Sequence, residues 1–278
     1  KKACIMKNRI VVATDFSQSS LTALTKAMFL AKKQKYTLDV VHVVEYSIFH
    51  DPKKDKKVGK EALAKFIADN FPTPEVEISQ FCYVGTIHQE INKHAKEREC
   101  RLLLVGATGE TQYLTEVLLG SVTKKIIRKS EIPVLVTKNE ALPDYVNIFS
   151  PTDFSDNSLK LAKTTRKFFP EANLVFYHMI SRPFELRLGR YGADEEQISK
   201  FNKSAEEEAR KCSKKFLENF SGKNEMVLDS GILSYTRLLS VAESKNVSLI
   251  ALPTSGKISF FALDVLQNAH VDVLIWKF

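Results

Sequence analysis

The sequence Thr-Asp-Phe-Ser occurs twice in the chain, at residues 14–17 and again at residues 152–155. Each copy follows a short apolar run and precedes a segment whose apolar residues have helical spacing. The copies lie 138 residues apart in a chain of 278 residues, so each half is one copy of a repeated unit. A unit of this length is the size of an ordinary domain and can bury its own core.

Strand-like and helix-like segments alternate through both halves, which predicts parallel sheets covered by helices. In the first half, strands are predicted at 8–13, 37–44, 75–84, 102–105 and 133–136. In the second half they are predicted near 146–150, 173–178, 225–229, 248–252 and 272–276. The predicted fold class is therefore α/β, with two doubly wound, Rossmann-like parallel sheets of five strands each. The predicted domains are 1–138 and 145–278, joined by a linker that contains Pro143.

Composition narrows the class of protein and its location. Hydrophobic residues make up 44% of the chain and charged residues 27%, as in ordinary globular proteins. No apolar run approaches the roughly 20 residues that cross a bilayer, and the first residues lack the apolar core of a signal peptide. The four cysteines are scattered, which argues against a zinc site or a redox motif. We expect a cytoplasmic protein without a membrane partner.

The net charge of +8 raises the question of nucleic-acid binding. One basic cluster, at residues 53–57, has no aromatic residues interleaved with its lysines. The other consists of Lys124, Lys125, Arg128 and Lys129 in the last turns of a predicted helix, where cations complement the helix dipole. Both clusters are interpreted as solvated surface, and no nucleic-acid partner is expected.

A second pattern in the first half suggests an anion site. Gly106 and Gly109 follow a buried strand, and Gly120-Ser121 begins the next predicted helix. Glycine allows backbone amides to approach an anion closely, and the free amides at a helix N-terminus attract negative charge. Asp15 ends the first strand, at the edge where open α/β sheets bind ligands. The pattern is that of a phosphate cradle without a Walker lysine.

With these residues the chain resembles the universal stress protein family, specifically its tandem two-domain members. Nucleotide-binding members of that family carry Gly-x2-Gly-x9-Gly-Ser/Thr after the fourth strand, and a Pro/Ala-Thr/Val-Asp sequence at the end of the first. The resemblance covers nearly the whole chain and implies a fold like that of the adenine nucleotide alpha hydrolases. It implies a stress-response module that binds ATP, with or without Mg²⁺. The site residues that it implies are Ala13, Thr14, Asp15, Val43, Gly106, Gly109, Gly120, Ser121, Val122 and Thr123.

The two halves depart from the family pattern to different degrees. In the first, the spacer at 110–119 has ten residues where the family pattern has nine. In the second, Pro151-Thr152-Asp153 matches, but only Gly256 of the first glycine pair remains, and Gln267-Asn268 stand near the place expected for Gly-Ser. The second loop is also eight residues shorter. We therefore expect nucleotide in the first domain and no cofactor in the second.

Alternatives to a nucleotide sensor remain open at this point. The runner-up is a non-nucleotide scaffold that binds a protein or a small apolar ligand through domains whose sites have both drifted. A third reading, a nucleotidyl-transfer enzyme, lacks its signature motifs. No general base is identifiable near a γ-phosphate, so no catalytic residue is assigned and the activity is at most a slow ATPase. The nucleotide preference and the protein partner are not given by the sequence.

The remaining expectations concern packing. The apolar runs at 134–136 and 273–275 would leave exposed sheet edges unless they were paired. Because single domains of the family associate through this strand in antiparallel fashion, the two halves are expected to form an intramolecular pseudo-dimer, and a further homo-oligomer is left open. His42 and His178 are expected to be packed histidines. His88 and His94 have no acid or cysteine at metal-ligand spacing.

Overall fold

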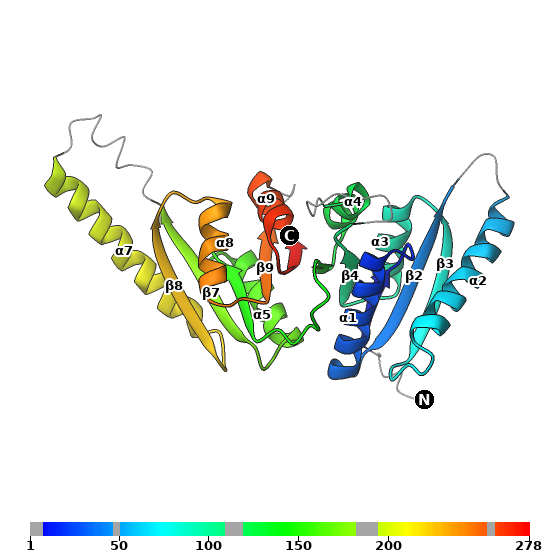
Figure 1. Ribbon diagram of the computed structural model, residues 1–278. Coiled ribbons are helices and arrows are strands. Elements are labelled where there is room, and N and C mark those ends of the chain that lie inside the picture. Colours follow the sequence, from blue (N-terminus) through cyan, green and yellow to red (C-terminus); the bar gives the residue numbers. More distant parts are fainter. Residues whose placement is uncertain (1–7, 47–50, 109–118, 182–193, 255–258) are drawn as a thin grey trace. The chain divides into compact units, whose positions relative to one another are not determined.

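The structure, a computed structural model, describes residues 8–46, 51–108, 119–181, 194–254 and 259–278 (Figure 1). They fall into two compact units. The first comprises Lys1–Asp144 together with Thr254–Phe278, and the second comprises Tyr145–Pro253. Strands and helices alternate in both, so the predicted α/β class is confirmed.

The first unit is built on a sheet with the strand order β3-β2-β1-β4-β5-β10. Its elements are β1 (Arg9–Ala13), α1 (Gln18–Gln34), β2 (Thr37–Glu45), α2 (Pro52–Asn70), β3 (Ile78–Gly85), α3 (Ile87–Glu97), β4 (Leu102–Gly106), α4 (Ser121–Lys129), β5 (Val134–Thr137), α9 (Phe260–Asn268) and β10 (Asp272–Lys277). Strands β1 to β5 are parallel. The chain leaves β1 toward β2 on one side and returns to β4 on the other, which makes the carboxyl end of β1 a topological switch point.

The central strands of this sheet are buried on both faces. The runs at 10–12, 102–105 and 134–136 are continuous Val, Ile and Leu, as expected of parallel strands between two helical layers. Helix α1 packs on β1 and β4, α2 packs on β3, and α3 packs against α4. The helices of this unit flank the sheet in Figure 1.

The final strand of the chain lies beside β5. Val273, Leu274 and Ile275 stand opposite Val136, Leu135 and Val134 in antiparallel register. All six of these side chains are buried. The predicted antiparallel pairing of the last strands of the two halves is confirmed, and it covers the edge that β5 would otherwise expose.

Because of this pairing, the boundary between the two units differs from the predicted domain boundary. The sequence predicted a second domain of 145–278, whereas residues 254–278 group with the first half in the structure. The cause is the set of contacts that β10 makes with residues of the first half. Besides the β5 ladder, Asp272 pairs with Lys26 on α1, and Lys277 donates a hydrogen bond to the Arg128 carbonyl on α4.

The second unit has a smaller parallel sheet with the order β9-β6-β7-β8. Its elements are β6 (Asn147–Pro151), α5 (Asp156–Phe168), β7 (Asn173–Ser181), α7 (Glu195–Leu217), β8 (Asn224–Gly231), α8 (Tyr235–Ser244) and β9 (Leu249–Thr254). The chain again leaves its first strand toward one neighbour and returns to the other side. The topology of the first half is therefore repeated.

The repeated Thr-Asp-Phe-Ser sequence forms the same turn in both halves. Phe16 and Phe154 have positive φ angles of 68° and 62°. In each turn the Phe amide donates a hydrogen bond to the Thr hydroxyl two residues earlier, at 3.1 Å and 3.0 Å. In each, the side chain of the Ser residue, Ser17 or Ser155, caps the following helix, and serine is one of the residues preferred at this position. The repeat therefore has a structural role of its own.

No helix in the described ranges has the length and hydropathy that a bilayer crossing requires.

Candidate functional site

A cavity of about 480 Å³ opens at the switch point of the first unit, beside the carboxyl ends of β1, β2 and β4. The N-terminal turns of α3 and α4 complete its wall. It is lined by Ala13, Thr14, Asp15, Ser20, Val43, Glu45, Ile87, Ile91, Val105, Gly106, Thr108, Gly120, Ser121, Val122, Thr123 and Ile126. Its volume is within the range of small-molecule sites.

Nine of the ten residues singled out from the sequence line this one cavity. They are Ala13, Thr14, Asp15, Val43, Gly106, Gly120, Ser121, Val122 and Thr123. The tenth, Gly109, lies outside the described residues, as does most of the spacer at 110–119. Residues from four separate segments of the chain are therefore brought together.

Asp15 lies at the mouth of the cavity with its side chain exposed. One carboxylate oxygen, Oδ1, accepts hydrogen bonds from the amide and hydroxyl of Ser17, at 3.1 Å and 2.6 Å. These bonds fix the orientation of the carboxylate, because both donors belong to the start of α1. Thr14 is buried behind it, with its hydroxyl 3.0 Å from that of Ser20.

The N-terminus of α4 has no side-chain cap. Its N-cap residue is Gly120, which makes no capping hydrogen bond. Within the described ranges, the amides of Ser121, Val122 and Thr123 have no hydrogen-bond acceptor. Unpaired first-turn amides and the helix dipole together favour an anion. The Thr123 hydroxyl donates to the Gly106 carbonyl at 3.0 Å and holds α4 against the end of β4.

Gly106 is required for packing as well as for any ligand. A Cβ atom at this position would lie 2.3 Å from the Ser19 hydroxyl and 2.9 Å from the Ser19 carbonyl carbon and oxygen. The first turn of α1 therefore approaches β4 so closely that only glycine fits. The Ser19 hydroxyl in turn accepts a hydrogen bond from the Thr108 amide at 3.4 Å.

The inner wall of the cavity is apolar and was largely missed from the sequence. It consists of Val43, Ile87, Ile91, Val105 and Ile126. The i, i+4 spacing of Ile87 and Ile91 marks one face of α3, but spacing alone predicts a buried face and not a cavity wall. Glu45, at the exposed end of β2, adds a second carboxylate to the lining and carried no sequence signal.

The corresponding turn in the second half holds its carboxylate more tightly. Asp153 Oδ1 accepts hydrogen bonds from the Ser155 amide and hydroxyl and also from the Ser158 hydroxyl at 2.6 Å. Burial alone would raise the pKa of Asp153, but the hydrogen bonds from Ser155 and Ser158 bring it below the usual value for Asp. In the first half, the equivalent Ser20 hydroxyl forms its hydrogen bonds with the Thr14 hydroxyl and the Ser17 carbonyl instead of with Asp15.

The prediction for the second phosphate loop needs a correction. Gln267 and Asn268 lie in the last turn of α9 and not at a helix start. Helix α9 begins after Ser259, whose hydroxyl accepts a hydrogen bond from the Ala262 amide at 3.1 Å. The Ala262 amide is the third of helix α9, as the Thr123 amide is the third of α4. In α9 this amide is hydrogen-bonded to the cap, whereas in α4 it is unpaired. Gly256 lies outside the described residues.

His42 and His178 are packed histidines in the structure. Each Nδ1 donates a 2.9 Å hydrogen bond to the carbonyl of the Thr in its own repeat, Thr14 or Thr152. Each ring packs on the Phe of the same turn, with centroids 4.3 Å and 4.2 Å apart. These histidines fix the turn beside the first strand.

His94 has neighbours in the structure that its sequence spacing did not reveal. His94 is buried, and its side chain lies with those of Asp39 and Cys100, so that one potential ligand atom from each is within 4.8 Å of the others. The three come from α3, β2 and the segment before β4, so no local spacing could reveal them. His94 Nε2 donates to Asp39 Oδ2 at 3.0 Å, and His94 Nδ1 accepts from the Tyr83 hydroxyl at 2.8 Å.

Two arginines make this cluster an ion-pair network. Arg9 and Arg98 both reach Asp39 Oδ2, at 3.4 Å and 3.1 Å. Burial alone would raise the pKa of Asp39, but hydrogen bonds from His94 and Arg98 hold it below its usual value. Burial raises the pKa of Cys100 to about 12, so its thiol is inert. Asp39 Oδ2 is therefore already bound by both arginines and by His94.

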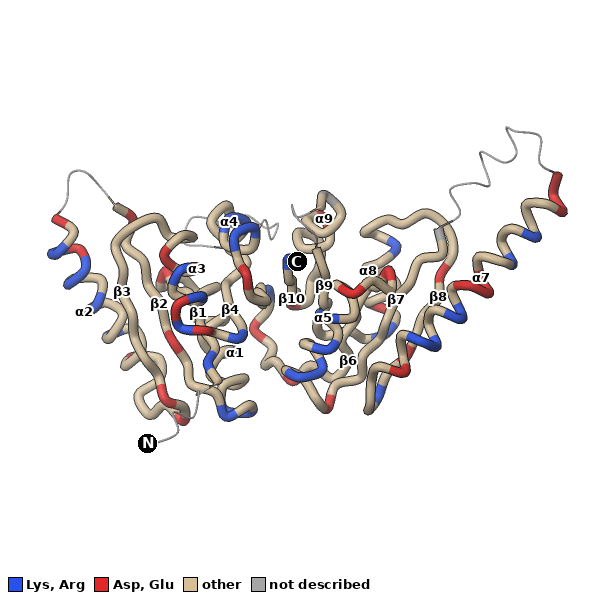
Figure 2. The backbone as a smooth tube through the Cα atoms, turned by 180° about the vertical axis from the view of Figure 1, so that it is seen from behind, with Lys and Arg blue, Asp and Glu red and all other residues tan. Residues whose placement is uncertain are grey.

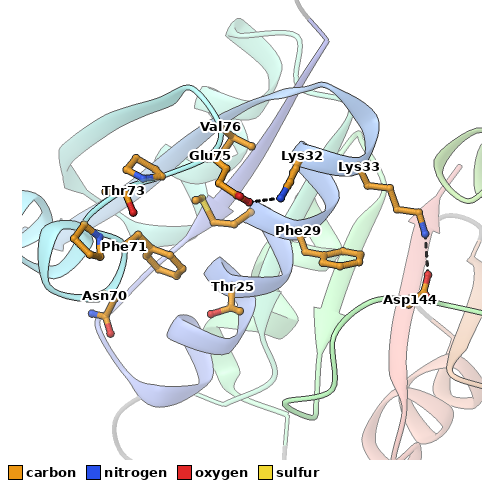
Figure 3. A pocket seen from close by; sticks show the side chains of 13 residues that line it. Thr25, Phe29, Lys32, Lys33, Asn70, Phe71, Thr73, Glu75, Val76 and Asp144 are labelled. Carbon is orange, nitrogen blue, oxygen red and sulfur yellow. Dashed lines mark hydrogen bonds and ion pairs between the residues drawn. The ribbon is translucent and has the colours of Figure 1, made fainter.

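A larger groove, of about 850 Å³, runs between α1 and residues 70–76 of the same unit (Figure 3). Phe29 and Phe71 supply its aromatic surface. Its lysines are paired: Lys32 with Glu75, and Lys33 with Asp144 at 2.8 Å. The groove therefore presents no uncompensated charge from these lysines, and none of the residues predicted from the sequence line it.

Comparison with known proteins gives matches in sequence and in structure. Residues 6–138 match the model of the universal stress protein family. The universal stress protein MJ0531 of Methanocaldococcus jannaschii is 32% identical over 142 residues, which cover 47% of this chain and 81% of that protein. The universal stress protein YxiE of Bacillus subtilis is 31% identical over 150 residues, which cover 48% of this chain and 100% of that protein.

The likeness extends to both halves at the level of fold. A crystal structure of a universal stress protein from Archaeoglobus fulgidus aligns with a TM-score of 0.71 and covers 98% of each chain, at 16% identity. At that identity the match concerns the fold alone.

Proposed function

The chain belongs to the universal stress protein family, and we propose that its first unit binds an adenine nucleotide, ATP, in the cavity beside β1 and β4. The observation that carries this proposal is the convergence of nine sequence-predicted residues on one cavity. The apolar wall formed by Val43, Ile87, Ile91, Val105 and Ile126 suits a purine base. The unpaired amides at the start of α4 suit phosphate.

The carboxylates of the cavity suit the ribose and the counter-ion of the nucleotide. Asp15 Oδ1 accepts hydrogen bonds from Ser17, and the other carboxylate oxygen, Oδ2, can accept one from a ribose hydroxyl. Carboxylate oxygens such as those of Asp15 and Glu45 are also ligands that Mg²⁺ prefers, usually together with substrate phosphates. Mg²⁺ would neutralise phosphate charge, because no Lys or Arg is among the described lining residues.

We assign no such role to the second half. The α9 N-terminus is capped by Ser259 and the Asp153 carboxylate is bound by three donors. The protein is proposed to act in the cytoplasm as a sensor whose nucleotide occupancy alters the binding of a protein partner. Hydrolysis is not part of the proposal, because the described lining residues at the start of α4 include no general base.

The repeat supplies a matched pair of variants for the test. Asp15→Asn and Asp153→Asn make the same change in the same turn, and the structural cost should be at least as large in the control, because Asp153 accepts one more hydrogen bond than Asp15. We expect Asp15→Asn to weaken ATP binding at least tenfold and Asp153→Asn to leave it within twofold. Ser121→Leu, at the exposed start of α4, should also weaken binding more than tenfold with an unchanged circular dichroism spectrum. Equal effects of the two Asp variants on ATP affinity would exclude the first cavity as the ATP site.

The apolar wall also supports the second candidate function, binding of a small apolar ligand. Mass spectrometry of the freshly purified protein under native conditions separates the two. A bound mass equal to that of an adenine nucleotide supports the proposal. A lipid-like or other apolar mass, lost in Val43→Trp because the larger side chain fills the cavity, would replace it.

A further inference from the structure

The exposed side of α4 carries positive charge and no acidic residue. Thr123, Ile126 and Ile127 face the interior and are buried. The opposite side presents Lys124, Lys125, Arg128 and Lys129, called here the α4 cationic face. Figure 2 shows these basic positions along the helix in blue. They recur at intervals of one helical turn, about 5.4 Å along the axis.

Strand β10 adds a fifth cation to this face. The Lys277 ammonium donates a 3.0 Å hydrogen bond to the Arg128 carbonyl. The nearest acidic residue in sequence, Glu131, is already paired with Lys96 at 2.9 Å. In the part of the chain that the structure describes, Lys277 and the four residues of the α4 cationic face form no ion pair with a carboxylate. The helix dipole offsets about half a charge, so most of the repulsion among them is uncompensated.

The same strand places an aromatic pair beside these cations. Trp276 and Phe278 are half-buried, and their ring centroids lie 4.5 Å apart. The Trp276 indole donates a hydrogen bond to the Glu131 carbonyl at 3.2 Å, which positions it just past the C-terminal end of α4. This proximity could not be predicted from the sequence, since 145 residues separate Trp276 from Glu131.

The other basic cluster of the chain differs from the α4 cationic face both in its acidic neighbours and in its lack of aromatic residues. Lys53, Lys54, Lys56 and Lys57 begin α2 around Asp55, and Lys57 lies 4.0 Å from Glu61. Acidic residues are interspersed with these lysines, and no aromatic residue is interleaved with them. The two clusters are therefore chemically distinct although their composition is similar.

We propose that the α4 cationic face, with Lys277, Trp276 and Phe278, binds single-stranded nucleic acid. Lysine and arginine spaced along one surface match the phosphates of a flexible backbone, and the counterions that they displace favour binding. Trp276 and Phe278 are each partly exposed beside these cations, and aromatic rings next to a basic surface are the combination typical of sequence-tolerant single-strand binding. An acidic protein segment would satisfy the cations but would make no use of a stacking surface. This proposal departs from the expectation, drawn from the sequence, that no nucleic acid is bound.

The test uses a fluorescein-labelled oligouridylate of twelve nucleotides and the full chain. Anisotropy reports binding, and the fluorescence of Trp276, the single tryptophan of the chain, reports stacking at the proposed surface. We expect saturable binding that quenches Trp276. With about four phosphates neutralised, the affinity should fall with a log–log salt slope of about −3.

Charge-matched variants locate the site. Lys125→Glu/Arg128→Glu should weaken binding at least tenfold, whereas Lys53→Glu/Lys54→Glu, with the same change of net charge, should stay within twofold. If the first variant melts early, Lys125→Gln/Arg128→Gln replaces it with the same expectation. Equal loss in both clusters, or binding without a change in Trp276 fluorescence, would overturn the proposal. Displacement of the oligonucleotide by poly-glutamate at equal charge concentration would also overturn it, in favour of an acidic protein.

Discussion

Lys26 and Asp272 form a buried ion pair that joins α1 to the final strand of the chain. Lys26 Nζ lies 2.5 Å from Asp272 Oδ2, and the two side chains are 1% and 0% exposed. The second Lys26 contact is Asn139 Oδ1 at 3.1 Å, and Asp272 Oδ1 accepts the Lys138 amide at 2.8 Å. Both charges are therefore hydrogen-bonded as well as paired, the condition under which a buried pair is tolerated.

Breaking this pair should be costly. Lys26→Met leaves Asp272 buried without its cation, which typically destabilises a protein by about 3–5 kcal/mol. Lys32→Met removes an exposed pair from the same helix and should cost less than about 1 kcal/mol. Urea unfolding of the two variants measures the difference. Similar losses in both would show that burial does not govern the strength of the Lys26 pair.

Because of the neighbouring Lys138, the free energy of unfolding should change with pH in the alkaline range. Its ammonium donates hydrogen bonds to the carbonyls of Gln267 and Ala269 near the end of α9, and burial lowers its pKa to about 8, with Asp272 opposing the shift. Because the unfolded chain keeps this proton up to a pKa near 10.4, the unfolded state binds more protons than the folded state between these values. Stability should therefore rise with pH in this window.

The Lys138→Gln variant isolates that contribution. Between pH 7 and pH 9 the wild-type chain should gain about 1 kcal/mol relative to the variant, from denaturant unfolding at each pH. A gain of the same size in the variant would assign the effect to other groups. A loss on raising the pH would contradict the sign of the shift.

Gly106→Ala should destabilise the first unit. The new Cβ would meet the Ser19 hydroxyl at 2.3 Å and its backbone at 2.9 Å, so α1 must move from β4. Overpacking of this kind costs about 1–3 kcal/mol. Ser19→Gly in the same chain relieves the hydroxyl contact but not the backbone contact, so it should restore only part of the loss. Complete rescue, measured by thermal unfolding, would show that the backbones are not in close contact.

Removal of residues 271–278 should lower the melting temperature of the first unit. The deletion uncovers β5, because Val273, Leu274 and Ile275 are buried against it, and it leaves Lys26 without Asp272. Differential scanning calorimetry of the truncated chain checks this. Deletion of residues 1–7, outside the described residues, is the control and should leave the transition within a few degrees. An unchanged transition in the first deletion would mean that β10 contributes nothing to this unit.

The sequence predicted most of the features that are local or repeated. The Thr-Asp-Phe-Ser repeats, the alternation of strands and helices around them and the nine site residues that line the cavity follow from short patterns whose spacing is set by strands and helix starts. The position equivalent to Gly-Ser was assigned wrongly to Gln267-Asn268, because the shortened second half offers no Gly-Ser and Ser259 is an ordinary capping residue without a distinctive context.

Features that depend on distant residues could not be predicted. Lys26 and Asp272 are 246 residues apart, and a lysine on the buried side of α1 has no local signal that names its partner. The Asp39, His94 and Arg98 network and the aromatic pair beside α4 arise in the same way, from neighbouring elements of the fold. Sequence spacing reports only which residues share an element.

Isothermal titration calorimetry with ATP and Mg²⁺ tests the central claim most directly. The cavity of the first unit, the unpaired amides of α4 and the Ser259 cap on α9 together predict one ATP per chain, with binding weakened more than tenfold by Ser121→Leu. A stoichiometry near two would contradict the asymmetry between the halves, and the absence of binding would contradict the proposed function itself.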